Sequence, residues 1–185
     1  PRVRASGSLR AMSFDDLDPL DTYRPRRLSR SVFVTLRGMR YHVRCWGDPG
    51  ATSEARPTLV LLHGWMDVSA SFQFVVDALA SHRHVIAPDW RGFGQTASAH
   101  GAASDTYWFP DYLADLDALL DAGLEGVDPD RPVDLVGHSM GGDAAMLYAG
   151  VRPERLRRLV NLEGFGLPAT RPDEAPERLR RWLDE

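Results

Sequence analysis

Lysine is absent from this sequence of 185 residues, in which all 22 basic residues are arginine. This absence excludes Schiff-base chemistry, a lysine general base and the lysine of a phosphate-binding loop. Proton transfer at any catalytic site must therefore fall to histidine, aspartate or glutamate.

Cysteine and long apolar runs are also scarce. The single cysteine, Cys45, cannot form an internal disulfide, and its alternating surroundings predict a buried packing residue. No apolar run approaches the roughly 18 residues that span a bilayer, and no secretory signal opens the chain. H-E-x-x-H and C-x-x-C motifs are missing, so we expect no metal and no nucleotide cofactor. These absences predict a cytoplasmic protein without a membrane partner.

Charge is distributed unevenly along the chain. Residues 1–40 hold nine arginines and four aspartates and sum to +5, whereas the remainder sums to −9. The acidic body argues against nucleic-acid binding. The arginine-rich residues 1–30 predict an irregular leader, which could be a transit-like segment, a patch for RNA or anionic lipid, or translated sequence ahead of a start at Met12. No feature of the sequence indicates an oligomeric state.

Hydrophobic periodicity predicts alternating strands and helices. Two β-rich runs, 31–36 and 40–46, flank Gly38 and predict an antiparallel hairpin. Short apolar runs typical of buried strands cover 58–62, 85–88, 133–136 and 159–162. Helical patterns cover 68–81, 110–122 and 141–151, and a further one covers 176–184. The fold class is therefore α/β, a doubly wound and mostly parallel sheet with an N-terminal antiparallel hairpin, and its core spans 31–166.

A serine lies at a sharp turn between a predicted strand and a predicted helix. The segment Gly137-His138-Ser139-Met140-Gly141-Gly142 fits the motif G-x-S-x-G in that context. The motif predicts a strained serine exposed above the sheet, with glycines that avoid collisions at the turn. The alternative is a chance turn in which Ser139 only caps the helix.

Two further segments follow predicted strands. His63-Gly64-Trp65 follows the strand 58–62, and Asp89-Trp90-Arg91-Gly92-Phe93-Gly94 follows the strand 85–88. The order of hairpin, H-G loop, D-x-R-G-x-G loop and serine elbow over residues 31–163 resembles the α/β-hydrolase fold serine hydrolases. The resemblance implies an α/β-hydrolase fold that is incomplete C-terminally.

The resemblance assigns roles at the serine. It implies that the backbone N–H groups of Trp65 and Met140 form an oxyanion hole for charge on the substrate. His63, Gly64, Asp89, Arg91 and His138 would support the site, and we expect neither His63 nor His138 to be the general base.

Glu163 ends the last predicted strand, where the resemblance places a triad acid in some branches, as in haloalkane dehalogenases. Those enzymes attack with aspartate, so Ser139 excludes dehalogenase and epoxide hydrolase chemistry here. The alternatives for Glu163 are an ion pair, for instance with Arg91, or a triad acid beyond residue 185.

The implied reaction is hydrolysis of an ester-like carbonyl through an acyl-enzyme on Ser139. Trp65, Phe72, Trp108 and Phe165 suggest a pocket for small hydrophobic esters. C–C bond hydrolysis, amidase, thioesterase or perhydrolase chemistry remain open, as does a non-catalytic ligand-binding relative. No histidine follows His138, so we expect these residues to be the N-terminal part of the fold, inactive alone, with 167–185 opening a cap.

Overall fold

A seven-stranded sheet forms the centre of the computed structural model, which describes residues 23–98, 106–165 and 171–184. The strand order is β1-β2-β4-β3-β6-β7, with the short β5 paired to β2. The antiparallel part comprises β1 (Ser29–Leu36), β2 (Met39–Trp46) and β5 (Ala97–Ser98). The parallel part comprises β3 (Leu59–Leu62), β4 (Val85–Pro88), β6 (Val133–His138) and β7 (Leu156–Leu162). The predicted fold class is confirmed.

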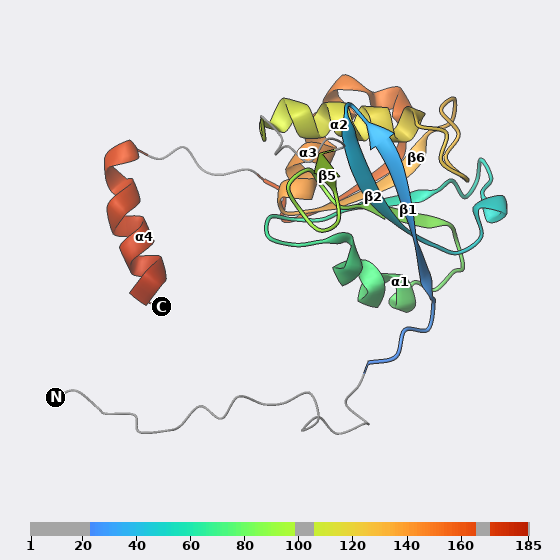
Figure 1. Ribbon diagram of the computed structural model, residues 1–185, viewed down its shortest axis with the longest axis horizontal. Coiled ribbons are helices and arrows are strands. Elements are labelled where there is room, and N and C mark those ends of the chain that lie inside the picture. The colour runs from blue at the N-terminus through green and yellow to red at the C-terminus, as the bar shows by residue number, and fades with distance from the viewer. Residues whose placement is uncertain (1–22, 99–105, 166–170, 185) are drawn as a thin grey trace.

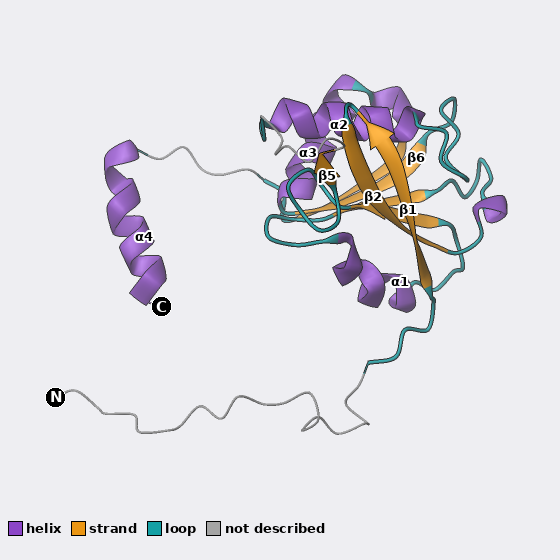
Figure 2. Ribbon diagram, in the orientation of Figure 1, coloured by secondary structure: helices purple, strands orange, loops and turns teal. Residues whose placement is uncertain are grey.

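Helices cover both faces of the sheet, as Figures 1 and 2 show. α2 (Phe109–Asp121) and α3 (Met140–Val151) pack on one face, and α1 (Gln73–Ala78) packs on the other. Short 3-10 turns are η2 (Pro49–Ala51), η3 (Ser69–Phe72), η4 (Pro153–Arg155) and η5 (Pro172–Glu174). The last helix, α4 (Ala175–Asp184), lies apart from the sheet in Figure 1. The helices and the sheet thus enclose two apolar cores, one under α2 and α3 and one under α1.

Several local features of the structure differ from the sequence predictions or were not predicted. The hairpin turn contains only Arg37 and Gly38, both with positive φ (47° and 80°), so Met39 already belongs to β2. The helix expected over 68–81 is observed as η3 followed by α1 and ends at Ala78, and the carboxylate of Asp89 accepts the N–H of Ser69, the first residue of η3, at 2.7 Å. β5 has two residues, which is too short for a periodicity signal.

The end of the expected leader is ordered against α1. Asp77 accepts hydrogen bonds from the Tyr23 hydroxyl and from the backbone N–H groups of Arg26 and Arg27, both at 2.8 Å. β1 begins at Ser29, two residues earlier than expected. The predicted leader therefore includes residues that pack on the core, and its residues 1–22 lie outside the described part of the chain.

The remaining broad expectations concern Cys45 and the membrane. Cys45 is buried, and burial raises the pKa of its thiol to about 11, which confirms a packing role. Among the described residues, no helix is long and apolar enough to cross a membrane. Residues 167–170 and 185 of the expected cap lie outside the described residues, as does residue 166 at the end of the expected core, whereas α4 agrees with the helix expected over 176–184.

Candidate active site

Ser139 occupies a strained turn between β6 and α3. Its backbone has φ 50° and ψ −120°, a conformation that a non-glycine residue adopts only when its surroundings enforce it. Its N–H donates to the Leu162 carbonyl at 2.8 Å, and its carbonyl accepts from the N–H groups of Gly142 and Asp143. The turn is therefore fastened to β7 on one side and to the first turn of α3 on the other.

Glycines permit the close approach of the chain at this turn. A Cβ on Gly137 would overlap the backbone of Gly141, and a Cβ on Gly141 would lie 2.7 Å from the His63 carbonyl oxygen. A Cβ on Gly64 would come within 3.1 Å of the Ser139 Cβ. The two predicted motifs, H-G and G-x-S-x-G, thus meet in space at the carboxyl ends of β3 and β6.

His63 fixes the loop that carries Trp65. Its ring is fully buried; Nε2 accepts the Trp90 N–H at 2.9 Å, so Nδ1 carries the proton and donates to the Gly64 carbonyl at 2.7 Å. Burial lowers the pKa of this imidazole below its ordinary value. Both ring nitrogens are occupied, so His63 holds the loop and has no free nitrogen for proton transfer.

Met140 is the first residue of α3, so the helix itself supplies no acceptor for its N–H. Trp65 lies on the opposite loop, and both residues line one cavity with Ser139. The positive end of the α3 dipole also lies at this point. This arrangement suits an oxyanion hole.

Asp89 is a buried anchor behind the loops. Its carboxylate accepts the backbone N–H groups of Ser69 at 2.7 Å and Gln95 at 2.8 Å, and contacts His42 Nδ1 at 2.8 Å. Burial alone would raise the pKa of this carboxyl, but the hydrogen bonds outweigh burial and lower it. Asp89 is therefore ionised, and it organises the D-x-R-G-x-G loop from within.

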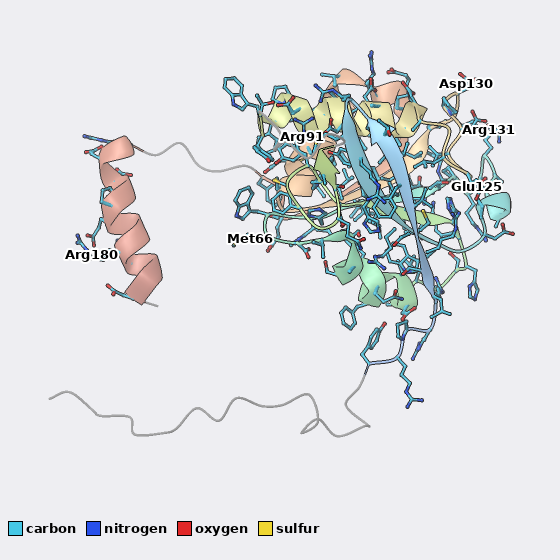
Figure 3. All side chains as sticks on the ribbon, viewed as in Figure 1. Met66, Arg91, Glu125, Asp130, Arg131 and Arg180 are labelled. Atoms are coloured by element: carbon cyan, nitrogen blue, oxygen red, sulfur yellow. The ribbon has the colours of Figure 1, made fainter. Side chains whose placement is uncertain are left out.

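Arg91 is buried and forms a two-point ion pair with Asp115 of α2, with N–O distances of 2.6 and 2.8 Å. Burial alone would lower the pKa of its guanidinium, but Asp115 raises it. Arg91 also donates to the Thr106 carbonyl at 2.9 Å, directly before Tyr107. The suggested pairing of Arg91 with Glu163 is therefore wrong; Arg91 instead joins the loop after β4 to the segment that enters α2. Figure 3 shows Arg91 within the body, whereas Met66, which is 80% exposed, lies at its edge.

Glu163 lies directly after β7, and its backbone has a positive φ of 60°. Its neighbours anchor the elbow: the Leu162 carbonyl binds the Ser139 N–H, and Gly164 packs against Gly142. The side chain is exposed, and among the described residues none forms a hydrogen bond with its carboxylate. His138 is likewise exposed, and no histidine nitrogen in the described part of the chain hydrogen-bonds to the Ser139 hydroxyl.

Ser139 opens into a cavity of about 890 Å³. The residues that line it are mostly apolar or aromatic: Trp65, Tyr107, Phe109, Tyr112, Ser139, Met140, Asp143, Met146, Leu147, Gly164 and Phe165. Of the aromatic residues expected there, Trp65 and Phe165 are present. Phe72 is instead buried with Val76 on the other face of the sheet, and Trp108 is 74% exposed to solvent.

Sequence reasoning missed several residues of the cavity wall. Asp143, Met146 and Leu147 follow Ser139 by four, seven and eight residues, which is the spacing of one helix face, so the elbow itself could have predicted them. Tyr107 and Phe109 flank Trp108 in an aromatic run, and the sequence did not show which of these side chains would face the cavity.

The family model for the alpha/beta hydrolase fold matches residues 57–184, which include the H-G loop, the serine elbow and the cavity wall. This chain belongs to the α/β-hydrolase fold family. The match covers more than half of the chain and agrees with the observed strand order and elbow.

Relatives within the family carry varied names. The chain is 31% identical over 140 residues to a serine hydrolase-like protein of Danio rerio, covering 76% of this chain and 39% of the relative. It is 39% identical over 112 residues to a 2-hydroxy-6-oxo-2,4-heptadienoate hydrolase of Pseudomonas putida, covering 59% and 38%. This α/β-hydrolase fold chain thus spans about two fifths of the length of these relatives.

Solved structures resemble it to a similar extent. A thioesterase domain from the curacin biosynthetic pathway matches with a TM-score of 0.62 and 27% identity, covering 85% of this chain and 51% of that one. An epoxide hydrolase from Vigna radiata matches with a TM-score of 0.60 and 28% identity, covering 83% and 46%. The shared scaffold therefore serves several reactions.

Proposed function

We propose that Ser139 is the nucleophile of a hydrolase that cleaves an ester-like carbonyl bond through an acyl-serine intermediate. The proposal rests on the strained backbone conformation of Ser139, with φ 50° and ψ −120°, in the wall of a cavity of about 890 Å³. A helix cap would not require this conformation, because capping residues usually adopt extended backbone angles. Strain of this kind gathers at functional sites.

The reaction would begin with attack of the Ser139 hydroxyl oxygen on the carbonyl carbon. The Trp65 and Met140 N–H groups would stabilise the negative charge on the carbonyl oxygen, and the alcohol would leave with a proton. By the family resemblance, a histidine would take the serine proton and Glu163 would orient that histidine. Water would then hydrolyse the acyl-serine and restore the hydroxyl.

The cavity wall supports a small hydrophobic substrate. Its aromatic and aliphatic side chains, including Trp65, Tyr112 and Leu147, offer apolar surface to an acyl or alcohol group. The proposal uses no metal and no nucleotide cofactor. The cytoplasmic location and the lack of nucleic-acid and membrane partners stay predictions from the sequence.

C–C bond hydrolysis is a second candidate, favoured by the 39% identity to the Pseudomonas putida hydrolase. The same serine, cavity and N–H pair would serve it, with a carbon leaving group. The two candidates are separated by offering one enzyme preparation both p-nitrophenyl esters and a 2-hydroxy-6-oxo-dienoate.

The test uses the longest product of the reading frame that encodes this chain. Ser139→Ala should lower kcat for p-nitrophenyl butyrate on the order of 10³-fold or more, because the covalent step is lost. Ser71→Ala, which changes an exposed serine that is not among the residues lining the cavity, should leave kcat unchanged. Equal turnover by wild type and Ser139→Ala would refute the proposal.

A further inference from the structure

A second serine, histidine and aspartate are arranged in hydrogen-bond sequence away from Ser139. Ser31 of β1 lies with its hydroxyl oxygen 2.8 Å from Nε2 of His42 on β2. His42 Nδ1 lies 2.8 Å from Oδ2 of Asp89, just after β4. Nucleophile, base and orienting acid are therefore within the distances that define a catalytic triad.

The tautomer of His42 follows from its partners. Asp89 accepts backbone N–H groups from Ser69 and Gln95 and is ionised, so its contact with His42 requires Nδ1 to donate. With the proton on Nδ1, Nε2 of a neutral ring would hold a lone pair and accept a hydrogen bond from the Ser31 hydroxyl. This is the protonation pattern that a general base needs before it activates a serine.

Burial separates the base from solvent but leaves the nucleophile open. His42 is completely buried and Asp89 is 2% exposed, whereas Ser31 is exposed on β1. Neither the Ser139 cavity nor the cavity at the opposite end of the strands, beside Thr58 and Gly126, includes Ser31. The open face sets no size limit, so the reactivity of the electrophile decides which compounds react.

Strand register places a positive charge beside Ser31. Ser31 pairs with Arg44 and Phe33 pairs with His42, so these four side chains share one face of the hairpin. The Arg44 guanidinium donates to the Ser29 hydroxyl at 2.9 Å on this face. It offers a donor for negative charge that develops on a reagent attacked by Ser31.

We propose that Ser31 is a second nucleophilic serine, activated by His42 and Asp89, that reacts with activated acyl and phosphonyl esters. With an alkyl fluorophosphonate, the Ser31 oxygen forms a bond to phosphorus and the P–F bond breaks. Fluoride leaves with the electron pair of that bond, and the serine proton passes to His42 Nε2 and then to water. With an activated phenyl ester, the Ser31 oxygen bonds to the carbonyl carbon, the bond from that carbon to the phenol oxygen breaks, and the phenolate leaves.

The test measures labelling rates of individual serines by peptide mass spectrometry. An alkyl fluorophosphonate is added to the Ser139→Ala variant. This variant lacks the Ser139 hydroxyl, so any labelling of Ser31 is independent of the proposed function. Ser71 is the internal reference, because it is exposed and its hydroxyl donates to Asp67 without an imidazole. We expect Ser31 to be labelled on the order of 10²-fold faster than Ser71, the gain typical of a positioned base.

A second variant separates activation from exposure. His42→Asn in the Ser139→Ala background retains an amide that can donate to Asp89 but has no nitrogen at the position of Nε2. It should reduce Ser31 labelling to the rate of Ser71, while thermal unfolding reports whether the hairpin still folds. If His42→Asn does not fold, the ratio of Ser31 to Ser71 in the parent decides. A ratio of Ser31 to Ser71 labelling rates near one would overturn the inference. The hydrogen bonds of His42 would then only connect the hairpin to the loop after β4.

Discussion

The buried ion pair between Arg91 and Asp115 allows a sharp test of what holds the cavity wall in place. Asp115 is 1% exposed and accepts from Arg91 at 2.6 and 2.8 Å, from Arg37 at 2.8 Å and from the Tyr41 hydroxyl. Asp115→Asn keeps the shape of the side chain but removes the negative charge. Arg91 then stays buried, and Asp111, at 3.4 Å, is the acid that remains near it among the described residues. Loss of one partner of a buried pair costs about 3–5 kcal/mol, and we expect about 3 because Asp111 remains.

Urea unfolding measures this loss, and α2 supplies a matched control. With a slope of about 1–3 kcal/mol per molar urea, the midpoint of Asp115→Asn should fall by about 1 M or more. Asp121→Asn breaks an exposed pair with Arg155, at 2.7 Å, and should cost less than about 1 kcal/mol. Equal losses in the two variants would refute the claim that burial gives the Arg91 pair its weight.

Two further predictions concern backbone contact and pH. Gly141→Ala should destabilise the protein by about 3 kcal/mol or more, because its Cβ would press on the backbone of Leu62 and His63. Gly150→Ala on the same helix meets nothing within 4 Å and should be neutral or stabilising. Thermal unfolding of the two variants measures the difference. Burial lowers the pKa of His84 from 6.5 to about 4, so only the unfolded chain takes up this proton between those values. Stability should be complete above about pH 6.5 and fall by about 3 kcal/mol towards pH 4, and His84→Gln should flatten this slope in urea titrations at pH 7 and 5; an unchanged slope would contradict the assignment.

Local sequence signals predicted the elements that form the Ser139 elbow. Short apolar runs marked the buried strands, and glycines at 137 and 141 marked a turn where chains touch. The strand runs and the turn could be predicted because residues close in the sequence determine them, as in the contact of Gly137 with Gly141. The spacing of Asp143 and Met146 from Ser139 carried the same kind of information and could have been used.

Long-range partners could not be predicted in this way. The placement of β4 between β2 and β3, the pairing of Arg91 with Asp115, and the meeting of Ser31, His42 and Asp89 all join residues distant in sequence. Their partners depend on the packed sheet, and one sequence offers several equally suitable carboxylates for each arginine. The start of η3 at Ser69 also involves such a partner, because Asp89 accepts its N–H.

The most direct test of the central claim is to treat the longest product of the reading frame with an alkyl fluorophosphonate and to map the modified serines. The account predicts an adduct on the peptide that contains Ser139, lost in Ser139→Ala and retained in Ser71→Ala. If the reagent leaves Ser139 unmodified while the protein is folded, the strained elbow is not a nucleophile site and the proposed hydrolase function is contradicted.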